Sequence, residues 1–163
     1  MTNLAVQHLI DLDEASDAET SAIGVKGWYL AQLRARGFRT PPGFVVTTHG
    51  YRHAINAGGI ENRLDQPWAE AQRAEPARGQ ALARKARHLI SELRIDAGDA
   101  DGIAHRLGAF GIDTEFAVRS SVPEDAVSGP ECTGIHTTFT NVAGPDQVIS
   151  RVQACWASLF GER

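Results

Sequence analysis

An arginine followed by two serines ends a short apolar segment of the chain. Phe116 and Val118 alternate with Ala117 and Arg119, which is the period of a β-strand and sets Arg119 on the face opposite to the apolar pair. A guanidinium at the end of a strand can bind phosphate through two parallel hydrogen bonds, with the serine hydroxyl and amide groups assisting. The spacing also allows a structural ion pair between Arg119 and either Glu124 or Asp125 of the next loop.

Lys26 is a second candidate for binding an anion. It lies in residues 24–27 (GVKG), at the start of a predicted helix, and helix N-termini favour anions. Only Lys26 and Lys85 are lysines among the 16 basic residues. The phosphate-binding pattern G-x-x-x-x-G-K-[ST] is absent. An exposed lysine in a turn loosened by glycines would give the same sequence.

A second strand, predicted over residues 134–142, carries two further candidates. Gly134 has no Cβ, so backbone there can approach a ligand closely. Thr138 lies four residues later on the same strand face, although a β-branched residue is ordinary in any strand. Glu124 and Asp125 precede this strand, but adjacent carboxylates point apart on an extended chain. We therefore predict no metal site in these residues.

Other chemistries find little support in the sequence. The six histidines include no H-E-x-x-H pair, and no G-x-S-x-G elbow accompanies them. Cys132 and Cys155 alone form neither a disulfide framework nor a zinc site. These observations favour a reducing, cytoplasmic setting.

The composition is that of one soluble globular domain. The chain has 163 residues, 42% of them hydrophobic, and a formal net charge of -4. This charge argues against generic nucleic-acid binding. No apolar run reaches the roughly 18 residues of a membrane-spanning helix, and the N-terminus lacks the pattern of a secretory signal.

Periodicity and breakers place these candidates on elements. In the first third of the chain the pattern predicts a helix over residues 21–37 that Gly37 ends, a strand over 44–47, and a helix over 49–57 capped by Thr47 or Thr48.

The middle of the chain is predicted to be a helical scaffold. Helices are expected over 80–93 and 100–109, with Pro76 and Gly79 breaking the chain before them. A last helix over 146–160 has a wide apolar face. Either the middle helices or another chain must cover that face.

Several motifs in the same order resemble the nucleotide-binding domain of the phosphoenolpyruvate synthase and pyruvate, phosphate dikinase family, which includes rifampicin phosphotransferases. They are residues 24–33 (GVKGWYLAQL, similar to G-G-K-x-x-N-L-x-x-L), 41–48 (PPGFVVTT), 116–142 (FAVRSS, then a glycine, a threonine and NV) and 152–160 (VQACWASLF). The chain departs from the family pattern at Val25, where a glycine is usual, and at Tyr29, where an asparagine is usual.

The resemblance implies an α/β (α+β) fold. The expected architecture is an ATP-grasp-like N-terminal lobe, with a small mixed sheet packed with helices, incomplete relative to the family. Residues 21–163 would form this lobe, and residues 1–20 would be an N-terminal extension.

The same resemblance assigns roles to the candidate residues. Lys26 and Arg119 would contact the phosphates of ATP, and Gly134 and Thr138 would come from the region that covers the nucleotide. The reaction would be phosphoryl transfer with Mg²⁺, whose ligands would lie outside this chain. The acceptor would be a histidine of a separate domain, pyruvate or an antibiotic hydroxyl.

The expected function is therefore the ATP-binding portion of a dikinase-like phosphotransferase, a kinase component that does not act as this chain alone. A partner chain with the remaining lobe and the phosphohistidine domain, or a homo-oligomer, would complete it. The alternative is a non-catalytic regulatory or interaction module derived from that lobe. Neither reading involves a nucleic acid or a membrane.

Overall fold

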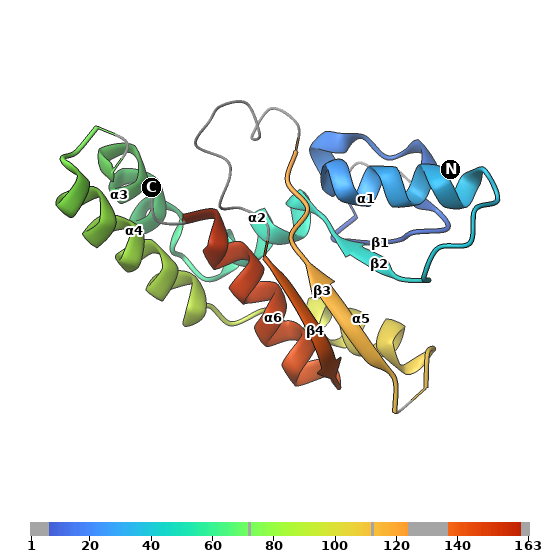
Figure 1. Ribbon diagram of the computed structural model, residues 1–163. Coiled ribbons are helices and arrows are strands. Elements are labelled where there is room, and N and C mark those ends of the chain that lie inside the picture. Colours follow the sequence, from blue (N-terminus) through green and yellow to red (C-terminus); the bar gives the residue numbers. More distant parts are fainter. Residues whose placement is uncertain (1–6, 72, 112, 124–136, 161–163) are drawn as a thin grey trace. The chain divides into compact units, whose positions relative to one another are not determined.

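The computed structural model describes residues 7–71, 73–111, 113–123 and 137–160 (Figure 1). They form an α+β fold in two compact units. Unit 1 contains the N-terminal residues up to His53 and also Ser121 with the two residues after it. Unit 2 contains Ala54–Ser120 and the described residues from 137 onward. No helix in the described ranges is long and apolar enough to cross a membrane.

Unit 1 is built from a small sheet and helices. Its elements are β1 (Leu9–Asp11), a 3-10 turn η2 (Ala15–Asp17), α1 (Thr20–Ala35), β2 (Phe44–Val46) and the first part of α2 (Thr48–Ala57). β1 and β2 are antiparallel, with Ile10 opposite Val45. Ile10 and Ile23 are buried at the centre of this unit, and Trp28 packs against them. Residues before α1 therefore supply one strand and part of the core.

Gly37 ends the first helix as the sequence predicts. Its φ of 81° lies in the left-handed region that favours glycine. The N–H of Gly37 donates to the carbonyl of Arg34 at 2.9 Å, and the N–H of Phe38 donates to the carbonyl of Leu33 at 3.0 Å. This pair of hydrogen bonds is a Schellman motif, which satisfies the last carbonyls of the helix.

Thr47, rather than Thr48, caps α2. Its Oγ1 accepts a hydrogen bond from the N–H of Gly50 at 3.2 Å, and its hydroxyl donates to the carbonyl of Gln7 at 2.6 Å. Thr47 is 1% exposed, and its hydrogen bond with Gly50 is buried, whereas the one to Gln7 is half-buried. One hydroxyl thus fixes the start of a helix to the segment that precedes β1.

Unit 2 is mainly helical. Its elements after α2 are α3 (Glu61–Ala71), α4 (Pro76–Ser91), α5 (Ala97–Gly108), β3 (Glu115–Arg119), β4 (Thr138–Ala143), α6 (Pro145–Ala157) and a 3-10 turn η5 (Ser158–Phe160).

Two predictions for the middle of the chain were wrong. Pro76 does not break the chain but begins α4, because a proline at the first helical position gives up an N–H that has no helical partner. Gly79 lies inside the same helix.

The helix α3 was not predicted. α5 begins three residues earlier than expected, since the Asp96 carboxylate accepts hydrogen bonds from the N–H groups of Gly98 and Asp99.

The apolar face of the last helix is covered within unit 2. α6 packs against α4, α5, β3 and β4, and Val148, Val152 and Cys155 are buried there (Figure 1). The guanidinium of Arg87 on α4 donates to the carbonyl of Phe160 at 2.5 Å. Of the two covers that the sequence allowed, the middle helices are therefore the one observed.

The strands do not form the single mixed sheet that was expected. In the described part of the chain β1 pairs with β2 and β3 pairs with β4, so each unit holds one antiparallel pair. β2 ends one residue before the end of the strand predicted over residues 44–47, and β3 contains the predicted alternation that ends at Arg119. Residues 134–136 of the second predicted strand lie outside the described residues.

Thr47→Val is expected to destabilise the chain by about 2 kcal/mol, because it leaves the buried N–H of Gly50 and the half-buried carbonyl of Gln7 without the Thr47 hydroxyl while nearly conserving shape. Thermal unfolding followed by circular dichroism should show a midpoint lower by several degrees. Thr48→Val is the matched control, since the Thr48 hydroxyl makes one exposed hydrogen bond, to Ser21. Equal midpoints for the two variants would contradict the role given to Thr47.

Candidate functional site

The first predicted motif lies at a break in α1. Gly24 has φ 70° and ψ 165°, so the helix is interrupted there and resumes with Val25. An unbroken helix would join the N–H of Gly27 directly to the carbonyl of Ile23, four residues earlier. The break separates these two groups and places Lys26 in the first turn of the longer segment of α1.

The hydroxyl of Ser121 fills this break. Its Oγ accepts a hydrogen bond from the N–H of Gly27 at 3.0 Å and donates to the carbonyl of Ile23 at 2.8 Å. The N–H of Val25 donates to the carbonyl of Val122 at 3.0 Å. Three hydrogen bonds therefore tie two motifs of unit 1 that are more than 90 residues apart in sequence. We call residues 23–27 with Ser121 and Val122 the serine clamp.

The serine clamp requires glycine at position 24. A Cβ at this position would lie 2.3 Å from Ser121 Oγ and 2.5 Å from the Ser121 carbonyl carbon. The φ and ψ of Gly24 also belong to a region that is essentially restricted to glycine. The close approach of the two segments thus depends on the missing side chain.

The serine clamp changes which groups near Lys26 can bind an anion. The sequence predicts a helix N-terminus there, whose N–H groups would attract phosphate. Those of Val25 and Gly27 instead donate to protein oxygens. Between these two residues stands Lys26, a half-buried residue that carries an ammonium group.

Arg119 and Thr138 lie directly opposite each other in the β3–β4 pair. Both are exposed, whereas Phe116 and Val118 are half-buried on the other face, so the predicted alternation is confirmed. Cβ atoms of directly opposed residues are about 5 Å apart. Two of the four predicted site residues are thus neighbours on one open face of unit 2.

The serines after Arg119 hydrogen-bond to backbone groups of the chain. Their hydroxyls were expected to assist phosphate binding, but Ser120 Oγ accepts from the N–H of Thr137 at 3.1 Å, and the Ser121 hydroxyl belongs to the serine clamp. The N–H of Ser120 also donates to the carbonyl of Thr137, at 3.0 Å. Both hydroxyls therefore stabilise backbone. The sequence did not predict the role of Ser121 in the serine clamp. The signal for this role is the presence of both the glycine motif around Lys26 and the serine motif after Arg119.

The remaining predicted residues lie either outside the described residues or on the other unit. Gly134 lies outside the described residues, as do Glu124 and Asp125. Lys26 belongs to unit 1, whereas Arg119 and Thr138 belong to unit 2. Each half of the predicted site is therefore described on its own unit.

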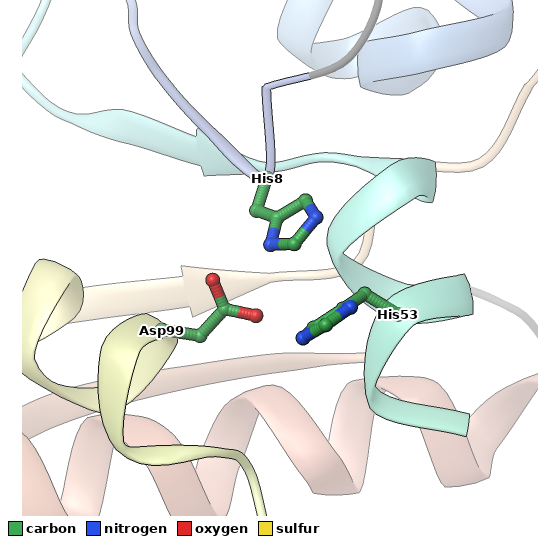
Figure 2. A group of neighbouring side chains, drawn as sticks. All are labelled: His8, His53 and Asp99. Atoms are coloured by element: carbon green, nitrogen blue, oxygen red, sulfur yellow. The ribbon is translucent and has the colours of Figure 1, made fainter. Parts of the chain in front are cut away.

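Two histidines of unit 1 lie against each other. The rings of His8 and His53 have centroids 4.4 Å apart and an interplanar angle of 30° (Figure 2). His53 is exposed and His8 is half-buried. Asp99, which is drawn with them, belongs to α5 of unit 2. Sequence spacing gave no sign of this pair, since 45 residues separate its members.

Gly24→Ala is expected to destabilise the chain by more than about 3 kcal/mol, because backbone strain and the clash with Ser121 add together. Gly37→Ala is the matched control: its φ is also positive, but nothing lies within 4 Å of the added Cβ. That variant should lose only about 1 kcal/mol. Urea unfolding of both variants measures the difference, and similar losses would contradict the close approach at Gly24.

Comparison with known proteins gives these motifs a context. The family described as pyruvate phosphate dikinase, AMP/ATP-binding domain, matches residues 20–163. A rifampicin phosphotransferase of Streptomyces sviceus is 32% identical, over 100% of this chain and 19% of that protein. One from Bacillus subtilis is 32% identical, over 95% of this chain and 18% of that protein. A probable phosphoenolpyruvate synthase of Methanocaldococcus jannaschii is 29% identical, over 93% of this chain and 13% of that protein.

The chain thus spans about a fifth or less of the length of these relatives. The family match includes both segments of the serine clamp and the Arg119–Thr138 pair. Because it extends over most of the chain, the resemblance inferred from the motifs is confirmed: the chain belongs to the pyruvate phosphate dikinase family, in its AMP/ATP-binding domain.

Proposed function

We propose that this chain is the ATP-binding portion of a phosphotransferase similar to rifampicin phosphotransferase and phosphoenolpyruvate synthase. Residues 21–163 would form an ATP-grasp-like N-terminal lobe after an extension of residues 1–20. Lys26 and Arg119 bind the phosphates of ATP, and Thr138 and Gly134 contribute from the second strand and the loop before it. The family match and the relatives support nucleotide binding and a transferase reaction at the coarser level.

The serine clamp is the observation that carries this proposal. It fixes the backbone on both sides of Lys26 to Ser121 and Val122. Arg119 precedes Ser121 by two residues, and two residues of extended chain span at most about 7 Å. The clamp therefore connects the turn that carries Lys26 to the segment that begins two residues after Arg119. Thr138 is then the residue opposite Arg119.

The two cations suit a triphosphate in complementary ways. Arg119 offers a planar fork that can make two hydrogen bonds to one phosphate, whereas Lys26 offers a compact charge. During phosphoryl transfer negative charge spreads over the transferred oxygens, so fixed cations stabilise it most in the transition state.

The acceptor is a histidine, pyruvate or an antibiotic hydroxyl. The rest of the machinery lies outside this chain, in another domain, in a partner chain or in a second copy. We place the protein in the cytoplasm, because its two cysteines give no disulfide framework.

The described residues of β3 and β4 around Arg119 and Thr138 do not fit a Mg²⁺ site. Mg²⁺ prefers carboxylates, phosphates and water in octahedral geometry. Arg119 and Thr138 offer a guanidinium and a hydroxyl, and Glu115 lies at the other end of β3, where it accepts a hydrogen bond from Asn141. We therefore assign no step of the reaction to a metal held by these residues.

A second candidate function is a non-catalytic interaction module. One observation favours it: Tyr29 and Phe38, on and just after α1, are 60% and 61% exposed. A docking surface requires exposed apolar groups of this kind to form a contiguous patch. The last helix no longer supports this alternative, since α4 and α5 cover its apolar face. Nucleotide affinity separates the two functions.

Lys26→Ala should weaken ATP binding about 10- to 100-fold, because a charge-assisted contact to phosphate contributes about 1.5–3 kcal/mol. Isothermal titration calorimetry of the full chain with ATP measures the dissociation constant. Lys85→Ala is the matched control, since Lys85 is the other lysine of the chain and lies exposed on α4. If both variants bind like the original chain, Lys26 is not a phosphate ligand.

Arg119→Ala should weaken ATP binding by a similar factor, because the guanidinium contacts phosphate at two points. The control is Arg84→Ala, which removes an exposed arginine of α4. Binding of adenosine, which has no phosphates, should be the same for both variants and the original chain. A chain that has no measurable affinity for ATP would instead favour the interaction module.

A further inference from the structure

We propose that Ser121 is a positioning residue for Lys26, an inference that rests on the proposed function. The Ser121 hydroxyl replaces the helical hydrogen bond that is missing between the Gly27 N–H and the Ile23 carbonyl. In this way it sets the direction in which the Lys26 side chain leaves the backbone. Ser121 need not touch ATP, because its effect passes through Lys26.

The hydrogen bonds give this role to the hydroxyl in particular. A group that bridges the Gly27 N–H and the Ile23 carbonyl must accept one hydrogen bond and donate another, and a hydroxyl does both. The two bridged residues stand immediately after and three residues before Lys26. Val25, the residue directly before it, donates to Val122. The Lys26 peptide is therefore held from both sides.

The packing makes the bridge specific to a small hydroxyl residue. Gly24 and Gly27 are both buried, and the position of a Gly24 Cβ is already occupied by Ser121 atoms. An alanine at 121 would fit this space but would leave the Gly27 N–H and the Ile23 carbonyl without their bridge. The turn that carries Lys26 would then sample other directions, while the remaining contacts of unit 1 persist.

A double-mutant cycle on ATP binding tests the inference. The full chain, Lys26→Ala, Ser121→Ala and the double variant are titrated with ATP in a calorimeter. Ser121→Ala should weaken binding about 3- to 10-fold in the original chain and have no further effect in the Lys26→Ala background. A merely structural serine would instead give the same loss in both backgrounds.

The outcomes separate this inference from the proposed function. Lys26→Ala binding ATP like the original chain overturns the phosphate role of Lys26, and the positioning role with it. A loss for Lys26→Ala together with no loss, or an equal and additive loss, for Ser121→Ala overturns the positioning role alone. Only the loss that disappears in the Lys26→Ala background supports it.

Val25→Pro provides a second test, which keeps the positioning role of the serine clamp falsifiable if Ser121→Ala does not fold. It removes the N–H that donates to Val122 and leaves the Ser121 hydroxyl in place. Proline is tolerated in the first turn of a helix, where Val25 follows the break at Gly24. The same coupling to Lys26→Ala is expected, and an additive loss would contradict the clamp as a positioning device.

Discussion

The hydroxyl of Ser121 connects the glycine motif around Lys26 to the segment that follows β3. It stands between the N–H of Gly27 and the carbonyl of Ile23, which a continuous helix would join to each other. An inserted hydrogen-bonding group is one of the few causes of a sharp break in a helix. Here the break is stabilised by contact between the glycine motif and the segment that follows β3. The geometry of Lys26 thus depends on residues almost a hundred positions away.

The hairpin of β3 and β4 provides the second fixed element. Its half-buried face packs on α6, and this leaves Arg119 and Thr138 on the open face. Directly after Arg119, the backbone and side chain of Ser120 hydrogen-bond to Thr137, which continues the pairing by one residue. The guanidinium therefore projects from backbone that is held on both sides. A fixed origin for a charged side chain lowers the cost of ordering it around an anion.

Local signals predicted the local structure well. Gly37 ends α1 and Thr47 caps α2 because each works through neighbouring backbone groups that the sequence places within four residues. The strand alternation around Arg119 was readable for the same reason. The break at Gly24 was not predicted, because its cause, Ser121, is distant in sequence. Pro76 was misread since proline both ends and begins helices, and only its position decides which. The partition of four strands into two sheets likewise depends on contacts between distant segments.

The serine clamp also tolerates one departure from the family motif. Val25 stands where the motif usually has a glycine, yet it contributes through its N–H, which every residue except proline supplies. Its backbone lies within the resumed helix, where a side chain causes no strain. Gly24 differs on both counts, since its φ is positive and the space of its Cβ is filled. Of the first two positions of the motif, the structure therefore requires glycine only at the first. Loss of the second glycine is no argument against a functional Lys26.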